Sequence, residues 1–235
     1  MASIILTILG AGLLVPYIIL RSKKNLLPGI LLKILISALF LLTTLTAAFG
    51  HSTWEPIFYN KWLIFGVVAG QIMGLLGDFW LDMKDMYAQH HDVFVFAGFT
   101  SFLIGHLFFI VGIFATYSLG PVALPVALGA GAVLGALALL TEKAMKLNYG
   151  KFRAIAVGYT AVFGAAIAVA LQGYLVTKST QSLVMTIGLV LFFLSDLVLS
   201  GTFFGQGKKR PVDYALNYLL YYGGQFVVAL SLLSL

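Results

Sequence analysis

Residues 62–82, WLIFGVVAGQIMGLLGDFWLD, combine the two features that decide how this chain folds. The stretch is apolar and long enough to cross a bilayer as one helix, which takes roughly 20 residues. It nevertheless ends in two carboxylates, Asp78 and Asp82, four residues apart. At roughly 100° per residue these side chains lie about 40° apart on the helix surface. The stretch is therefore predicted to be a transmembrane helix with acidic side chains near one end.

The rest of the chain has the same character. Of its 235 residues, 61% are hydrophobic and 9% are charged, and the mean hydropathy is +1.03. Soluble domains carry about 25% charged residues. We therefore predict an all-α integral membrane protein with one domain, residues 1–235, and no β-barrel, because the apolar runs do not alternate in polarity. The eight predicted spans are about 2–20, 29–49, 62–82, 93–117, 119–140, 152–176, 182–204 and 212–235.

The basic residues predict the orientation of these spans. Loops after the odd-numbered spans hold twelve of the fourteen lysines and arginines, if Lys33 at the start of the second span is counted with the loop before it. Loops after the even-numbered spans hold only Lys61 and Lys178. Because positive loops stay in the cytoplasm, both termini are predicted to lie outside. The net charge of +6 is explained in the same way, and no basic stripe with interleaved aromatic residues suggests nucleic-acid binding.

A weak internal similarity recurs at an offset of about 118–121 residues. The stretch LLGDFWLDM, residues 75–83, is echoed by FLSDLVLSG, residues 193–201, so that Asp78 corresponds to Asp196. The offset equals four spans, which keeps the two copies in the same direction. The sequence therefore allows parallel four-helix repeats, 1–118 and 119–235, about an axis along the membrane normal. Chance likeness between apolar helices is the alternative.

The polar residues inside the spans are the candidates for function. Asp78 and Asp196 are expected about 6–12 Å inside the cytoplasmic edge, and a carboxylate in a helix centre costs roughly 2.5–3.5 kcal/mol on insertion scales. Such residues usually mark functional sites. We predict a polar pocket with Asp78 and Asp196 as the reacting groups. The residues expected to bind or orient a ligand there are Asp82, His106, Ser195, Asn217, Tyr221, Tyr222 and Gln225.

Each of these candidates also has a purely structural interpretation. The aspartates could hold helices together by hydrogen bonds, and Asp82, at the predicted membrane boundary, could be solvated. His106 could be a packing histidine whose hydrogen bonds are satisfied. Tyr222 and Gln225 could link helices, and Ser195 could bond to the carbonyl four residues before it.

Metal and cofactor chemistry has little support in the sequence. The chain has no cysteine, and His106 has no second histidine one turn away. His90-His91-Asp92 is more simply a solvated loop, because the spacing of helical zinc motifs is absent. Lys208-Lys209-Arg210 is interpreted as an ordinary basic loop that could meet a lipid phosphate. We expect no metal and no cofactor.

Four short motifs, in order along the chain, resemble those of the YhhN-like lysoplasmalogenase family. They are GD-x-x-L from Gly77, G-x-x-x-F-x-x-x-H from Gly98, SD at Ser195, and YY-x-x-Q-x-x-x-x-x-S from Tyr221. The resemblance implies hydrolysis of the vinyl ether bond of lysoplasmalogens, which yields a fatty aldehyde and glycerophosphoethanolamine or glycerophosphocholine. It also implies that the partners are a lysophospholipid and the bilayer. We expect a bacterial inner membrane, with the site toward the cytoplasmic leaflet because the predicted orientation places Asp78 and Asp196 near that edge. The oligomeric state is not indicated.

This chemistry suits the residues already singled out. Vinyl ether hydrolysis needs an acid that protonates the β-carbon, an anion that stabilises the resulting cation, and a base for water, demands that paired carboxyls also meet in glycoside hydrolysis. Asp78 and Asp196 would divide these roles. The rival interpretations are a proton-coupled transporter, a metal-dependent membrane hydrolase and a lipid-binding protein without catalysis.

Overall fold

The computed structural model describes residues 1–23, 25–205 and 210–235, and the described residues are organised entirely by helices. Eight of the helices are long and apolar enough to cross a membrane, as the sequence predicts. The long helices are α1 (Ala2–Ser22), α2 (Leu26–Phe49), α4 (Lys61–Met86), α5 (His91–Thr116), α6 (Ala123–Ala144), α7 (Arg153–Thr177), α8 (Thr180–Phe203) and α9 (Pro211–Leu230). Short helices are α3 (Glu55–Tyr59), η1 (Ala88–His90), η2 (Gly150–Phe152) and η3 (Ser231–Ser234).

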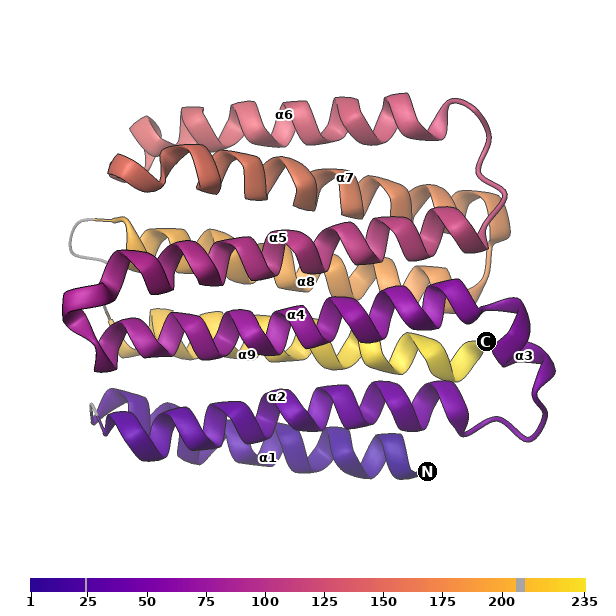
Figure 1. Cartoon of the computed structure of the whole chain (residues 1–235), viewed down its shortest axis with the longest axis horizontal. Coiled ribbons are helices and arrows are strands. Elements are labelled where there is room, and N and C mark those ends of the chain that lie inside the picture. Colours follow the sequence, from indigo (N-terminus) through magenta and orange to yellow (C-terminus); the bar gives the residue numbers. More distant parts are fainter. Residues whose placement is uncertain (24, 206–209) are drawn as a thin grey trace.

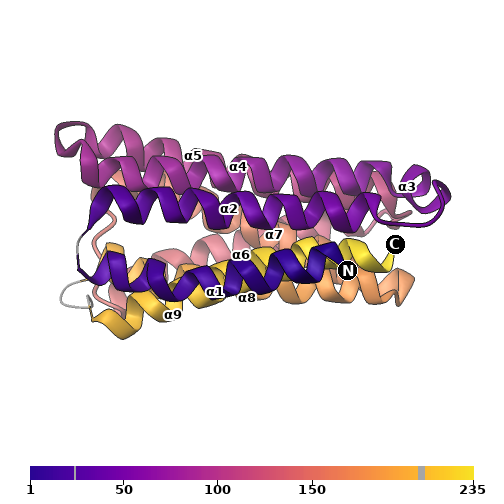
Figure 2. The same cartoon turned by 90° about the horizontal axis from the view of Figure 1, so that it is seen from below.

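The long helices run side by side along the longest axis of the molecule (Figure 1). Viewed from below, α2, α4 and α5 form one layer, with α1, α8 and α9 on the opposite side of the bundle (Figure 2). Both termini lie at the same end, next to α3 (Figure 1). The helices therefore form an even-numbered membrane bundle. Which end faces the cytoplasm stays a prediction.

Local signals explain where the last two helices begin. The Ser179 side chain accepts a hydrogen bond from the backbone N–H of Ser182 at 3.2 Å and caps α8. Pro211 occupies the first turn of α9, where its missing N–H costs nothing. The Asp213 carboxylate there accepts from the backbone N–H of Arg210 at 3.3 Å. The charged loops thus end where the apolar runs begin.

Glycines bring α4 and α5 together. A Cβ on Gly66 would lie 2.6 Å from the carbonyl oxygen of Phe108, and one on Gly70 would lie 2.9 Å from that of Gly105. Larger side chains would force these helices apart. Gly66 and Gly70, four residues apart on α4, therefore serve helix packing, and the contact fixes the helix that carries Asp78.

The two outer helices are held differently. α1 packs on both α2 and α9, and a Cβ on Gly10 would lie 2.2 Å from the ring of Phe226. Further along α1, the Tyr17 ring meets that of Tyr218 with a centroid distance of 4.8 Å. In the described residues, α6 packs extensively only on α7. One outer helix therefore closes against the bundle, whereas the other leaves space beside it.

The helix neighbours are arranged as a parallel repeat would require. α2 packs on α4 as α7 packs on α8, and α9 packs on α2 as α5 packs on α7. These are the pairs that an offset of four spans would relate. The looser attachment of α6 departs from the pattern. The repeat itself stays a prediction that this packing supports.

Counting Lys33 with the loop before the second span underestimates its depth. α2 begins at Leu26 and not at residue 29, so Lys33 lies two turns inside the helix and is only 6% exposed. A lysine at this depth is costly unless it is paired. Two carboxylates of α4 provide that pairing, and this combination defines the candidate site.

Candidate active site in the bundle

A cavity of about 820 Å³ lies inside one end of the bundle, and all eight long helices contribute to its wall. Its mouth carries the cations Arg21, Lys84 and Lys151. The deepest lining residues lie about 15–17 Å from the ends of their helices at 1.5 Å per residue, and apart from Tyr221 they are apolar: Phe102, Leu134, Phe163 and Phe192. The volume falls in the range of about 300–1,000 Å³ that is typical of ligand pockets. The cavity is therefore polar at its mouth and apolar at its floor.

Asp78 occupies the most polar part of this wall. Its carboxylate is buried and receives three donors: Lys33 Nζ at 3.2 Å, Ser37 Oγ at 2.7 Å and the Tyr221 hydroxyl at 2.8 Å. The donors come from α2 and α9, so three helices meet at one side chain. Hydrogen bonds to a charged group are stronger than neutral ones. These three donors would stabilise Asp78 in its ionised form.

Asp82 extends the same network toward the mouth. Its Oδ1 lies 3.3 Å from Lys33 Nζ and 3.6 Å from Arg21 Nη2, and Arg21 also binds Asp85 at 3.0 Å. The Asp82 side chain is buried. Its Oδ2 has no hydrogen-bond partner among the described residues. Asp82 is thus part of a buried ionic network, and the solvated-boundary interpretation is wrong.

Asp196 lines the same cavity from α8, with different neighbours. The Tyr159 hydroxyl of α7 donates to its Oδ2. Within the described part of the chain, no lysine, arginine or histidine forms an ion pair with Asp196. Leu197 and Phe193 flank it on the cavity wall. The structure therefore brings both predicted aspartates to one cavity but gives a cation to only one of them.

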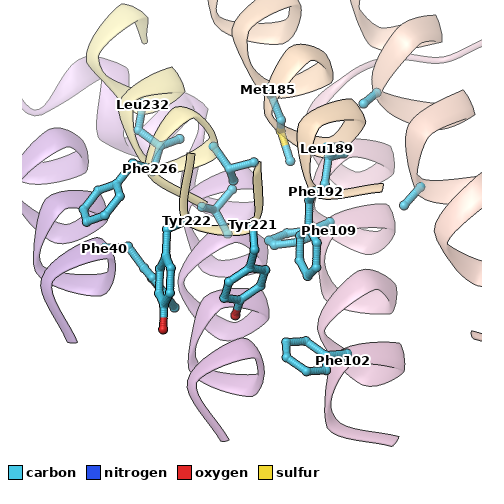
Figure 3. Packing of buried hydrophobic residues seen from close by; sticks show 14 of the residues in the cluster. Phe40, Phe102, Phe109, Met185, Leu189, Phe192, Tyr221, Tyr222, Phe226 and Leu232 are labelled. Atoms are coloured by element: carbon cyan, nitrogen blue, oxygen red, sulfur yellow. The ribbon is translucent and has the colours of Figure 1, made fainter. Parts of the chain in front are cut away.

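The α9 residues divide into two groups. Tyr221 and Asn217 line the cavity, and the Asn217 amide donates to the carbonyl of Ser195, also on the wall, at 2.8 Å. Tyr222 and Gln225 do not line it. The rings of Tyr221 and Tyr222 extend in the same direction from α9 (Figure 3), and the Tyr222 hydroxyl lies 3.4 Å from Ser37 Oγ. Tyr222 thus reaches the Asp78 network from behind the cavity wall.

Gln225 supports this network from deeper in the bundle. The Gln71 side chain donates to the Gln225 carbonyl at 2.9 Å, and Gln225 Nε2 lies 3.4 Å from the Tyr221 hydroxyl. Thr44 in turn donates to the Gln71 side chain. The amides therefore link α2, α4 and α9 and hold Tyr221 in place. The helix-linking interpretation describes Gln225 better than contact with a ligand.

His106 is placed away from the cavity wall. Its Nδ1 lies 2.6 Å from the Phe102 carbonyl of the preceding turn, and its ring is enclosed by aromatic rings, the nearest being Phe163 with a centroid distance of 3.8 Å. Its Nε2 has no hydrogen-bond partner among the described residues. The ring packs on Tyr159 at 5.3 Å between centroids. His106 therefore borders the residue that binds Asp196 and does not itself line the cavity.

Four polar residues of the site were missed by the sequence analysis: Lys33, Ser37, Tyr159 and Arg21. A signal for two of them existed, because Lys33 and Ser37 are four residues apart in an apolar run and so share a helix face. Tyr159 gave no such signal, since a tyrosine in a membrane span is ordinary. Placing Lys33 at the start of the second span, and counting it with the loop, hid the cation that pairs with Asp78.

The described residues of the basic loop and of the histidine-containing loop contribute little to the cavity wall. His91 and Lys151 line the mouth, and Asp92 pairs with Lys151. Lys208 and Lys209 lie outside the described residues, and Arg210 pairs with Asp213 at 2.8 Å. Among the residues that the structure describes, no group of three or more histidine, cysteine, aspartate or glutamate side chains is arranged to hold a metal ion. The described donors offer hydrogen bonds and charge, and no metal-binding cluster.

The comparison with protein families gives one match. The model of the YhhN family matches residues 29–232, which include every aspartate and tyrosine of the site described above. No curated protein and no solved structure matches the chain.

Proposed function

The chain belongs to the YhhN family, and on that premise we propose that it is a lysoplasmalogenase, which hydrolyses the vinyl ether bond of lysoplasmalogens. The observation that carries the proposal is the pair of aspartates, one from α4 and one from α8, on the wall of one cavity. The cavity has cations at its mouth and an apolar floor. A lysophospholipid has the matching polarity, with a phosphate at one end and a hydrocarbon chain at the other.

The different neighbours of the two aspartates suggest how the roles divide. Asp78 is paired with Lys33 and receives two hydroxyl donors, which suits an anion that stabilises positive charge. Asp196 has no cation partner in the described residues, which suits a carboxyl that carries the proton. We therefore assign Asp196 as the general acid and Asp78 as the stabilising anion and base.

The reaction then balances with water as the only co-substrate. Asp196 gives its proton to the β-carbon of the vinyl ether, and the oxygen-bearing carbon becomes an oxocarbenium ion opposite the Asp78 carboxylate. Water adds to that carbon and passes a proton to Asp78, leaving a hemiacetal. The hemiacetal loses the glycerol oxygen as a hydroxyl group and forms the aldehyde. Proton return to Asp196 through cavity water resets the pair.

Tyr221 and Asn217 would orient the glycerol part, and Arg21 and Lys84 at the mouth would meet the phosphate. By the positive-inside rule this cation-rich end would face the cytoplasm, which would place the site in the cytoplasmic leaflet of a bacterial inner membrane. The ammonium of an ethanolamine or choline headgroup would meet Asp85, which also lines the cavity.

Aldehyde release from lysoplasmenylethanolamine by the purified protein tests the proposal. We expect turnover of the vinyl ether and none of the saturated alkyl ether analogue, which cannot form the cation by protonation. Asp78→Asn and Asp196→Asn should each keep less than about a tenth of the wild-type rate, since general acid–base catalysis is usually worth 10²–10⁴-fold. Wild-type protein that releases no aldehyde, or Asn variants that keep most of the rate, would refute it.

A further inference from the structure

Two helices, α6 and α8, both line the cavity but do not pack closely on each other. α6 and α8 each contribute residues at a spacing of three to four, which places them along one side of each helix. Those of α6 are Leu134, Leu137, Ala138 and Thr141, and those of α8 are Phe193, Asp196, Leu197 and Ser200. α7 lies behind them and contributes Ala156, Tyr159, Thr160 and Phe163. We call this part of the cavity the α6–α8 slot.

The slot reaches the outer surface of the bundle. Leu137 and Leu197 line the cavity and are nevertheless 44% and 40% exposed. α6 can stand away from α8 because its extensive packing, within the described residues, is with α7 alone. The outer helix of the other half, α1, packs on α9 as well as on α2, with Gly10 against the Phe226 ring. Among the described residues α6 lacks such a second extensive contact, so it leaves space beside it.

The depth of the cavity does not suffice for a lipid chain. Asp196 lies about 10 Å and Asp78 about 12 Å from the ends of their helices, whereas the floor lies at about 15–17 Å. Only about 3–7 Å of cavity remain beyond the aspartates. A lipid chain fills half of a hydrocarbon core about 30 Å thick, so it needs about 15 Å. A chain whose reacting end lies at the aspartates must leave the cavity sideways.

We propose that the α6–α8 slot holds the alkyl chain of a single-chain lipid, which runs past Asp196 and out between the two helices into the bilayer. This inference rests on the proposed function and adds the path of the substrate to it. Five leucine and phenylalanine side chains of the slot suit a hydrocarbon chain, namely Leu134, Leu137, Phe163, Phe193 and Leu197. The β-carbon of a vinyl ether is the carbon on the chain side, so the slot delivers it to Asp196, the carboxyl assigned as its acid.

The absence of cysteine from the chain allows a clean test. Leu137→Cys places a single thiol on the slot wall, and Leu140→Cys places one on the same helix at a residue that is 63% exposed and does not line the cavity. A bulky methanethiosulfonate reagent modifies either thiol and is removed by reductant. Leu197→Cys probes the opposite wall and serves if Leu137→Cys does not fold.

The readout is binding of a saturated alkyl ether lysophospholipid in nanodiscs, followed by aldehyde release from the vinyl ether. Modified Leu137→Cys and modified Leu197→Cys should bind the alkyl ether lipid at least about tenfold more weakly, the effect of displacing two methylene groups from an apolar site. Reductant should restore binding. Modified Leu140→Cys should stay within about twofold of the unmodified variant.

Binding separates this inference from the proposed activity. Reversible loss of alkyl ether binding in the slot variants supports the slot even if the protein releases no aldehyde, in which case only the activity fails. Aldehyde release and lipid binding that persist after modification of both slot variants overturn the slot and leave the activity standing. An equal loss of lipid binding in modified Leu140→Cys also overturns the slot, because the reagent would then weaken binding even when it is attached outside the slot.

Discussion

Asp78 and Asp196 line the same cavity, but the side chains around them differ. Asp78 has a lysine at 3.2 Å and two hydroxyl donors, all within the packed centre of the bundle. Asp196 has a tyrosine hydroxyl and, among the described residues, no cation, and it faces the open slot beside α6. Identical side chains can thus be prepared for different chemistry by their neighbours alone. The half that closes its outer helix holds the proposed anion, and the half that leaves its outer helix apart holds the proposed acid.

Asp78→Asn should have the largest effect, because it should lower both turnover and stability. The variant should lose about 10²–10⁴-fold of its turnover. It should also unfold more easily, because Asp82 is then the one carboxylate that pairs with the buried Lys33 among the described residues, and removing one member of a buried ion pair costs about 3–5 kcal/mol. Thermal unfolding in detergent measures the second effect. An unchanged midpoint would show that Lys33 does not depend on Asp78.

Asp196→Asn should separate the two effects. Turnover should again fall about 10²–10⁴-fold. The unfolding midpoint should change little, because no buried cation among the described residues loses its partner and the amide oxygen still accepts from Tyr159. Activity and unfolding of the same preparation are compared. A drop in stability as large as that of Asp78→Asn would contradict the asymmetry.

Lys33→Met removes the cation and leaves the carboxylate. We expect a loss of stability of about 3–5 kcal/mol and low activity, since Asp78 then lacks its counter-ion. The double variant Lys33→Met with Asp78→Asn should recover part of the stability without recovering activity. Denaturation of the single and double variants measures the coupling. Additive losses would mean that the two side chains act independently in stability.

Removing the hydroxyl of Tyr159 or of Tyr221 should lower turnover by a smaller factor. Tyr159→Phe removes the hydroxyl that donates to Asp196 and should lower turnover about tenfold, as expected for a hydrogen bond to an ionisable group. Tyr221→Phe should cost only about threefold, because Ser37 and Lys33 still bind Asp78. Steady-state kinetics on both variants test the order, and the reverse order would count against the assigned roles.

His106→Phe should have the smallest effect. The histidine lies among aromatic rings and does not line the cavity, so a ring of similar volume should keep turnover within about threefold. Kinetics with lysoplasmenylethanolamine provide the measurement. A hundredfold loss would restore His106 to the site, as the family motif implies, and would require it to act through Tyr159.

The sequence predicts the fold well because membrane spans can be identified from their length and hydropathy. It also predicts Asp78 and Asp196, since carboxylates are rare and costly in spans. Lys33 was missed because a basic residue near the start of a span resembles an interfacial one, and only the observed start of α2 at Leu26 shows its depth. Tyr159 was missed because its role comes from a neighbouring helix. His106 and Gln225 are the reverse case, because these polar residues of the spans do not line the cavity and have the contacts of helix packing.

We propose that Asp196 carries a proton while Asp78 is an anion. Infrared spectroscopy of the purified protein at neutral pH measures this difference. The account predicts a C=O stretching band of a protonated carboxyl that disappears in Asp196→Asn and persists in Asp78→Asn. A wild-type spectrum without that band, or a band that Asp78→Asn alone removes, would contradict it.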